Sequence, residues 1–276
     1  MKISKLLVGL IKYMFVITLV VISVVPIVWV LMSSFKTNAQ ILESAFKLPE
    51  TLNWSNYFNA FKIAPLTTFY INSIFVAVFG TGMNLIIIGM AAYVFARFEF
   101  KAKSILMLVF SISLLIPNTS VLYPLYVTMN KLGLYDKLQG LILVYIGFGL
   151  PVTLYILKSY FLTIPKEIEE SAKLDGAGFL RTFIQIILPI AKPGFGTAGV
   201  MQFLLCWNEF QFALILTSGN NSRTLPVALS YFNTQFASNY GAMFAATVII
   251  VIPSIIIYAI LQEQVVSGLA AGAVKG

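Results

Sequence analysis

The sequence predicts an all-α integral membrane protein with six transmembrane helices and a cytoplasmic helix-turn-helix loop between the fourth and fifth helices. Hydrophobic residues make up 59% of the 276 residues and charged residues only 10%, which excludes an ordinary soluble domain with a polar shell. Six separate apolar stretches each reach about 20 residues, the length that an α-helix needs to cross a bilayer core about 30 Å thick. We expect a single transmembrane domain over residues 1–276.

The six apolar stretches define the expected spans. Five of them contain no Asp, Glu, Lys or Arg, and the exception, the fifth along the chain, contains only Glu209. The first stretch follows three lysines, but it is too long for a secretory signal and no small-residue cleavage site follows it, so we expect it to be retained as a helix. The expected spans are residues 13–32, 71–95, 105–129, 138–157, 194–216 and 242–261.

The distribution of basic residues predicts the orientation in the membrane. An even number of spans places both termini on one side. With the termini inside, 12 Lys and Arg residues are cytoplasmic and 6 are outside, so the positive-inside rule favours cytoplasmic termini. Loop 163–193 is then cytoplasmic, and loops 35–70 and 217–240 lie on the outer side of the membrane. This topology accounts for the net charge of +8 without a nucleic-acid partner.

The composition also excludes several kinds of chemistry. The chain has no His, and its single cysteine, Cys206, stands in an apolar run, which excludes His-based acid/base chemistry, Cys/His metal sites and internal disulfides. No Walker-type phosphate loop is present, so any ATP is used by another subunit. Gly194, Gly196 and Gly199 match the spacing of a dinucleotide site, but they open a membrane helix and follow no strand. We expect no catalytic residues, no metal and no cofactor.

The third span contains a proline near its middle. Pro117 frees a backbone carbonyl, which then needs a neighbouring helix or water as a partner. Asn118, next to it, therefore faces a pathway or belongs to a packed kink, and the sequence leaves both interpretations open. After this span, the run Gly-Leu-Tyr-Asp at residues 133–136 predicts a tight outer turn into the fourth span.

Residues 163–193 form the only long charged loop between two expected spans. Pro165 suits the first turn of a helix, and three glutamates follow it at the positive end of the helix dipole. Glu169 stands four residues before Lys173, a spacing at which opposite charges pair on a helix surface. These residues specify a first helix with an exposed acidic face.

A turn and a second helix are expected to follow. Gly176 turns without steric penalty and, with Asp175, ends the first helix. The next segment places Phe179, Phe183 and Ile187 on one side at i, i+4 and i+8, which gives an apolar face under the membrane. From these residues alone, a docking element and a structural re-entrant loop are equally favoured.

This loop strongly resembles the cytoplasmic coupling motif, often called the EAA loop, of the inner-membrane permease subunits of ATP-binding-cassette importers. Ser171 stands where that family usually has Ala, a small change that leaves docking plausible. The residues that match are Glu170, Ser171 and Ala172, then Gly176, and the run Ile186, Ile187, Leu188 and Pro189. The resemblance implies ATPase coupling by Glu170, Ser171, Ala172, Asp175, Gly176 and Ala177.

The resemblance extends over nearly the whole chain and narrows to the carbohydrate branch of the family, to the permease paired as the smaller subunit in maltose-type systems. Each match is weak alone, but the ordered set is specific. The matching segments are residues 69–73 entering the second span, 124–126 and 132–134 after the third, 207–210 in the fifth, and the tail 268–276.

The resemblance implies a transport complex in the membrane. Two cytoplasmic ATPase subunits close on ATP, the docked loops of two permeases move with them, and the pathway turns from inward-facing to outward-facing. An extracellular solute-binding protein delivers the sugar, and loop 217–240 resembles the one that reaches into that protein's cleft. Asn220 and Asn221 are the polar tip of this loop, although a plain flexible turn is an equally favoured interpretation.

The fifth span holds most of the candidate pathway residues. Gln202, Trp207, Asn208 and Glu209 offer amides, a carboxylate and an aromatic face, which are groups that bind sugars, and Asn118 joins them as a candidate. A hydrogen bond between packed helices explains Glu209 equally well. One rival class is a gradient-driven secondary transporter in which Glu209 carries a coupling proton, but such carriers usually have several polar coupling groups and related halves. A membrane scaffold without a transport role is the second rival.

Overall fold

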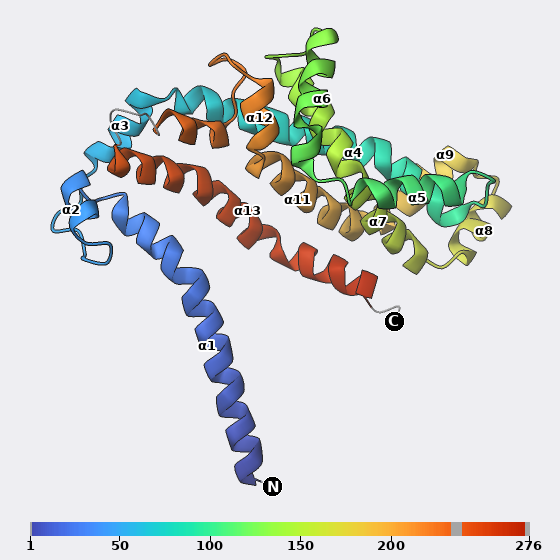
Figure 1. Cartoon of the computed structure of the whole chain (residues 1–276). Coiled ribbons are helices and arrows are strands. Elements are labelled where there is room, and N and C mark those ends of the chain that lie inside the picture. The colour runs from blue at the N-terminus through green and yellow to red at the C-terminus, as the bar shows by residue number, and fades with distance from the viewer. Residues whose placement is uncertain (1, 233–238, 274–276) are drawn as a thin grey trace. The chain divides into compact units, whose positions relative to one another are not determined.

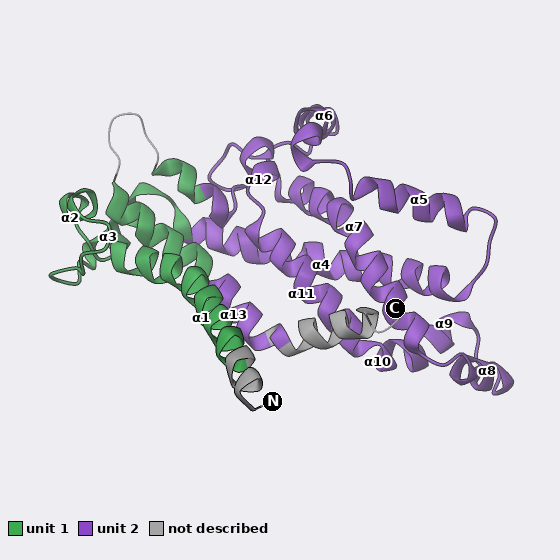
Figure 2. Ribbon diagram, turned by 60° about the horizontal axis from the view of Figure 1, so that its bottom comes forward, with its two compact units in different colours: residues 1–66, 228–252 green, residues 67–227, 253–276 purple. Residues whose placement is uncertain are grey.

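The computed structural model describes residues 2–232 and 239–273. Every regular element in these residues is a helix (Figure 1), which confirms the predicted all-α class. The chain divides into two compact units, residues 1–66 with 228–252 and residues 67–227 with 253–276 (Figure 2). Within the described residues, four helices are long and apolar enough to cross a membrane, and the number is six if each of two bent helix pairs counts as one span.

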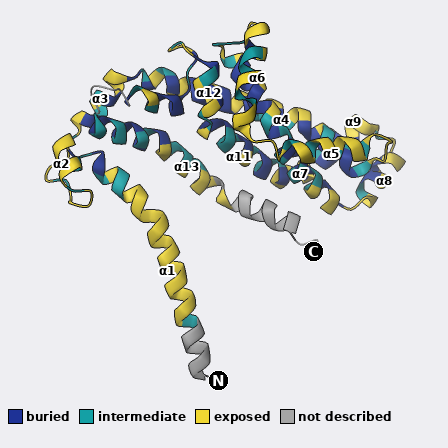
Figure 3. Ribbon diagram, viewed as in Figure 1, coloured by how far each residue is buried: buried dark blue, intermediate teal, exposed yellow. Residues whose placement is uncertain are grey.

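The first unit begins with a long apolar helix. Helix α1 is followed by two short helices, and residues 10–28 of α1 are exposed (Figure 3). A helix that is apolar all round and uncovered by protein is typical of a membrane span, since lipid takes the place of a core. The helices of this part are α1 (Lys2–Ser33), α2 (Asn38–Glu43) and α3 (Ser55–Ile63).

The end of α1 is held by buried polar contacts within the first unit. The Lys36 side chain is only 1% exposed, and its Nζ donates to the carbonyl oxygen of Ala45 at 3.1 Å. The Trp29 indole N–H donates to the same carbonyl at 2.7 Å. The Asn56 amide of α3 donates to the carbonyl oxygens of Ser34 and Lys36, each at 2.8 Å. These bonds attach the end of α1 and the residues that follow it to α3 and to the segment that carries Ala45.

The second unit contains most of the remaining helices. Their apolar faces meet in one core that joins α4, α7, η1 and α11, with Tyr93, Leu157, Phe161, Phe183 and Ile187 among its buried members. The elements are α4 (Leu66–Arg97), α5 (Lys103–Ser113), α6 (Asn118–Lys131), α7 (Leu138–Thr163), α8 (Glu167–Leu174), α9 (Phe179–Thr182), the π-helical η1 (Phe183–Ile187), α10 (Leu188–Ile190), α11 (Lys192–Asn208) and α12 (Gln211–Leu216). The 3₁₀ helix η2 (Leu225–Tyr231) and α13 (Tyr240–Ala273) each have residues in both units.

The expected third span is not one helix. Residues 105–129 fall on α5 and α6, which are bent by 103° at a break between them. Pro117 is the residue before α6 and has extended backbone, with φ −67° and ψ 132°. The proline lacks an N–H group and disfavours helical backbone in the residue before it, so the chain turns here instead of kinking within one helix.

The expected fifth span is also interrupted. Residues 194–216 fall on α11 and α12, because Glu209 between them has extended backbone with ψ 128°. The bent helix pair that is long and apolar enough to count as one span consists instead of α11 and the preceding segment Phe179–Ile190. These two segments are bent by 78° relative to each other. The expected second, fourth and sixth spans each fall within one longer helix, α4, α7 and α13.

Candidate functional site

The charged loop after α7 contains the two helices and the turn that the sequence predicts. Helix α8 ends at Leu174 with Asp175 as its cap, and Gly176 follows with φ +77°, a left-handed conformation that glycine adopts without strain. The Gly176 N–H donates to the carbonyl of Lys173 at 3.0 Å, and the Ala177 N–H donates to the carbonyl of Ala172 at 2.9 Å. This pair of bonds is the Schellman motif, which satisfies the last carbonyls of α8 and fixes the direction of the turn.

The predicted coupling residues form a mostly exposed tip. Glu170, Ser171, Asp175 and Gly176 are exposed, whereas Ala172 is 5% exposed and faces inward. Leu174 is 89% exposed, the highest fraction among the large hydrophobic side chains of the described residues. Leu174 therefore stands uncovered at the tip, between the exposed carboxylates of Glu170 and Asp175.

The structure corrects the expected partner of Glu169. Its carboxylate is buried, and it pairs not with Lys173 but with Arg97 at the end of α4, at 2.5 Å between Oε1 and Nε. The Tyr93 hydroxyl donates to the other carboxylate oxygen at 2.9 Å, and Arg97 Nη2 donates to the carbonyl of Ile164 at 2.8 Å. Helix α8 is therefore attached to α4 on its inner face, while Glu170 points outward.

The second helical segment of the loop packs against the buried helical core of the second unit. Phe183 and Ile187 are buried at 6% and 0% exposure, as their spacing predicts, and Phe183 lies against Tyr93 with 5.0 Å between ring centroids. Phe179 is 46% exposed, although its ring also lies 5.5 Å from that of Tyr93. The loop thus has a buried apolar side and an exposed acidic side.

Two of the candidate pathway residues are buried between helices. Gln202 is 2% exposed, and its amide donates to the carbonyl of Tyr145 at 3.0 Å. Gly149 of α7 allows this approach, because a Cβ there would lie 1.8 Å from the Gln202 Oε1 atom. Trp207 is also 2% exposed and lies edge-on to Tyr70 with ring centroids 5.6 Å apart. Both side chains connect α11 to its neighbours.

Glu209 organises the break between α11 and α12. Its Oε1 atom accepts from the Phe212 N–H at 2.7 Å, and its Oε2 atom accepts from the Ala213 N–H at 3.0 Å and from the Tyr145 hydroxyl at 2.7 Å. The carboxylate therefore satisfies N–H groups that the start of α12 leaves without helical partners. Asn208, just before it, is exposed, and its side-chain oxygen accepts from the Ser254 hydroxyl at 2.9 Å.

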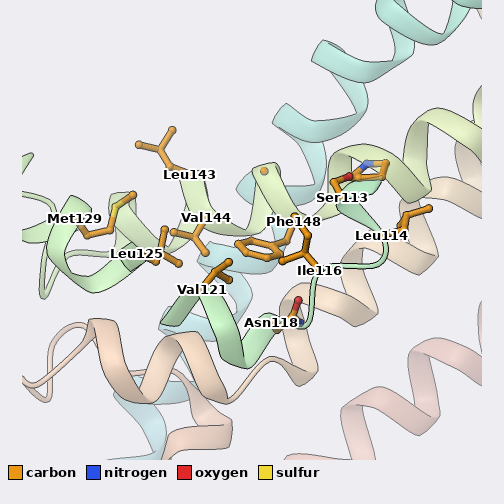
Figure 4. A pocket seen from close by; sticks show the side chains of 12 residues that line it. Ser113, Leu114, Ile116, Asn118, Val121, Leu125, Met129, Leu143, Val144 and Phe148 are labelled. Carbon is orange, nitrogen blue, oxygen red and sulfur yellow. The ribbon is translucent and has the colours of Figure 1, made fainter. Parts of the chain in front are cut away.

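Asn118 lies apart from the other pathway candidates. It lines a largely apolar cavity of about 440 Å³ formed by α5, α6 and α7 (Figure 4). None of the candidates from the fifth span lines this cavity, so the structure does not bring Asn118 together with them. The cavity is lined by Ser113, Leu114, Ile116, Asn118, Val121, Leu125, Met129, Leu143, Val144, Gly147, Phe148 and Pro151.

Asp136 is a site residue that the sequence suggested only as part of a turn. Its φ is +57°, and its Oδ1 atom accepts from the N–H groups of Ser218 and Gly219 at 2.8 and 2.9 Å and from the Ser222 hydroxyl. Burial raises the pKa of Asp136, but these hydrogen bonds, led by that of Ser222, outweigh burial and lower the pKa to about 2. The carboxylate thereby holds the segment that carries Asn220.

The tip of this segment borders a polar cleft. Asn220 and Asn221 are both exposed and line a cleft of about 450 Å³ together with Phe75, Lys137 and Gln139. The remainder of the expected outer loop 217–240 includes residues 233–238, which lie outside the described residues. Asn220 and Asn221 thus stand on a segment that Asp136 fixes from one side.

This combination of apolar helices and an exposed acidic loop agrees with the comparisons to known proteins. A family model described as "Binding-protein-dependent transport system inner membrane component" matches residues 84–270, and the chain belongs to that family. It is a multi-pass inner-membrane permease subunit and not itself an ATPase, so the expected importer-permease family is confirmed.

Several relatives are similar over most of their length. The diacetylchitobiose uptake system permease protein NgcG of Streptomyces coelicolor is 36% identical over 254 residues, which cover 91% of this chain and 84% of that protein. The trehalose transport system permease protein SugB of Mycobacterium tuberculosis is 36% identical, with 92% and 93% covered. The trehalose/maltose transport system permease protein MalG of Thermococcus litoralis is 34% identical, with 94% of each covered.

A solved structure has the same fold. A chain from the crystal structure of a bacterial ABC transporter involved in the import of the acidic polysaccharide alginate superposes with a TM-score of 0.81 at 24% sequence identity. The superposition covers 94% of this chain and 97% of that chain. The fold of that transporter chain therefore extends over nearly all of the present chain.

Proposed function

We propose that this chain is the transmembrane permease subunit of an ATP-binding-cassette sugar importer, that it forms half of the translocation pathway, and that loop 163–193 couples it to the ATPase. This proposal rests mainly on the structure of the loop. Its tip is held rigidly by the turn at Gly176, and its exposed side presents Glu170, Asp175 and Leu174. Relatives named for diacetylchitobiose, trehalose and maltose support sugars as the substrate class.

The proposed membrane arrangement has six crossings. They are α1, α4, the α5–α6 pair, α7, α11 with α12, and α13, with both termini in the cytoplasm. Loop 163–193 is then cytoplasmic, and loops 35–70 and 217–240 are outside. The excess of Lys and Arg in the segments assigned to the cytoplasm supports this orientation.

Coupling in this proposal is a movement of the loop tip with the ATPase. Two cytoplasmic ATPase subunits close on ATP, and the exposed residues of α8 sit in the cleft of one of them. ATP favours the closed ATPase, and the bonds between α8 and α4 carry that preference into the helices, so the pathway turns outward. An extracellular solute-binding protein delivers the sugar at the segment that carries Asn220 and Asn221.

The candidate pathway residues divide into two groups in this proposal. Asn118 and Asn208 are exposed and offer amides to the sugar. Gln202, Trp207 and Glu209 act by holding the helices around the pathway, because their polar atoms or rings already contact neighbouring helices or the start of α12. The partner permease supplies the other half of the sugar contacts.

The experiment is uptake into vesicles that contain the reconstituted complex. The proposal predicts sugar uptake that requires both ATP and the binding protein. Glu170→Lys should abolish this uptake, and Gly176→Ala should lower it severalfold, because a Cβ at φ +77° strains the turn. Gly178→Ala is the matched control, since Gly178 has φ −71° and a Cβ there would have open space.

The same vesicles test the rival mechanism. A secondary transporter would take up sugar with a proton gradient alone and without ATP. The Glu209 carboxylate would then have to bind and release a proton while it accepts three hydrogen bonds, two of them from backbone N–H groups. Uptake that is driven by a gradient, or full ATP-driven uptake by the Glu170→Lys and Gly176→Ala variants, would contradict the proposal.

A further inference from the structure

Buried polar side chains near the start of helix α4 contact the segment that carries Asn221. The Asn72 amide donates to the carbonyl oxygens of Asn221 and Arg223 at 3.0 and 2.9 Å, and the Ser73 hydroxyl accepts from the Leu225 N–H at 2.7 Å. Asn72 is 7% exposed and Ser73 is 2% exposed. Three backbone groups of that segment, at the alternate residues 221, 223 and 225, are thus tied to adjacent residues of one helix.

The other end of α4 is tied to the charged loop. Tyr93 and Arg97 both bond to the Glu169 carboxylate, and Arg97 also bonds to the Ile164 carbonyl. The side chains of Arg97 and Glu169 are 4% and 8% exposed. A buried ion pair gains little net stability because its desolvation is costly, so its contribution here is a fixed geometry between α4 and α8.

The helix between these two sets of bonds is continuous. Helix α4 runs without a break or an internal proline from Leu66 to Arg97, and the 25 residue steps from Asn72 to Arg97 span about 37 Å at the rise of an α-helix. Two neighbours in the second unit are less regular, since α7 contains Pro151 and the α11–α12 segment is interrupted at Glu209. The two ends of α4 are therefore joined by one unbroken helix with no internal proline.

We propose that α4 is the mechanical link between the sugar-delivery side and the ATPase side of this permease. Asn72 and Ser73 are the positioning residues at one end, and Tyr93 and Arg97, acting on Glu169, are the positioning residues at the other. This inference rests on the proposed function, which assigns partners to the two segments. Docking of the binding protein then shifts the loop tip through α4, and closure of the ATPase shifts the outer segment by the same path.

The experiment uses the complete reconstituted transporter and measures the ATPase rate without and with sugar-loaded binding protein. The ratio of the two rates reports coupling, whereas a merely structural role would change yield or melting. Asn72→Ala alters the outer end. The double variant Arg97→Met/Glu169→Met alters the inner end without leaving a single buried charge unpaired. The pair of Glu99 and Lys103, whose side chains are 88% and 18% exposed, gives the matched control when both are changed to Met.

Each end variant should lower the stimulation ratio, by between about twofold and thirtyfold, while the ATPase still co-purifies. Combining the two ends should lower the ratio no further than the more severe variant does, within roughly twofold, because one element is already uncoupled. The control pair should keep the wild-type ratio. If the double Met variant does not assemble, Tyr93→Phe tests the same end by removing one hydroxyl.

Two results would overturn the link through α4. One is a wild-type ratio in Asn72→Ala together with a wild-type ratio in an assembled inner-end variant. The other is a combined effect equal to the product of the separate effects, which is expected of independent sites. Either result leaves the proposed function intact, provided that the wild-type complex responds to the binding protein. If the wild-type complex shows no stimulation, the proposed function fails, and the link fails with it.

Discussion

Asp136→Asn isolates the charge that holds the segment 218–222. Asparagine tolerates the φ of +57° at this position and keeps a side-chain oxygen at the place of Oδ1, so backbone strain does not contribute. What is lost is the negative charge that accepts from the N–H groups of Ser218 and Gly219 and from the Ser222 hydroxyl. Hydrogen bonds to a charged acceptor are stronger than those to a neutral amide oxygen.

The magnitude follows from the pKa of Asp136. Lowering this pKa from its ordinary value of 3.8 to about 2 corresponds to about 2.4 kcal/mol at face value. The carboxylate is only half-buried, and solvent screening reduces the contribution to about 1 kcal/mol. Because the folded pKa is depressed, this stability is present above pH 3.8 and is lost as the pH falls toward about 2.

Hydrogen exchange of the peptide covering residues 217–224 measures this local stability. At pH 7 the Asp136→Asn protein should exchange about fivefold faster than wild type, the factor that corresponds to about 1 kcal/mol. The ratio should stay constant from pH 7 to pH 5 and should approach one as the pH falls below 4. Equal exchange at pH 7, or a ratio that does not change at low pH, would refute the assigned role of the carboxylate.

Three further changes each test a contact within one of the two units. Gly149→Ala should cost about 1–3 kcal/mol in the free energy of unfolding, because its Cβ would stand 1.8 Å from a facing side-chain amide, whereas Gly147→Ala, with nothing within 4 Å, should be neutral in melting experiments. Glu209→Gln should lower stability by about 1–2 kcal/mol through a weaker cap on α12 without changing the KM for sugar, and a changed KM at full stability would contradict this role. Lys36→Met should cost about 0.5–1.5 kcal/mol by removing one of the two donors to the Ala45 carbonyl, the other being the Trp29 indole N–H, and an unchanged melting temperature, as expected for the half-exposed Lys47→Met control, would count against that contact.

Features that depend on neighbouring residues were predictable from the sequence. The apolar stretches predicted membrane helices, and Gly176 predicted the turn after α8, because a left-handed residue there requires no other contact. The apolar face of Phe183 and Ile187 followed from helical spacing alone. Pro117 indicated a perturbation in the third span, but a proline is compatible both with a kink and with a full break, so the angle of 103° could not be predicted.

Features that depend on distant partners were not predictable. The i+4 rule suggested Lys173 as the partner of Glu169, yet the carboxylate pairs with Arg97, which lies 72 positions away in the sequence. Asn72 and Asn221 meet across 149 positions, and nothing in either local sequence indicates it. The sequence indicates that Glu209 is a carboxylate within an apolar stretch, where burial is costly. Its role as a cap could not be predicted, because it depends on the break before α12, which leaves N–H groups without helical partners.

The most direct measurement of the central claim is the composition of the complex that co-purifies with the tagged chain from native membranes in mild detergent. Mass spectrometry of the wild-type complex should find a second permease and an ATPase subunit. The Glu170→Lys complex should retain the permease and lose the ATPase, because the change reverses a charge on the exposed face of α8. A wild-type chain that emerges without either partner, or a Glu170→Lys complex that keeps its full share of ATPase, would contradict the account.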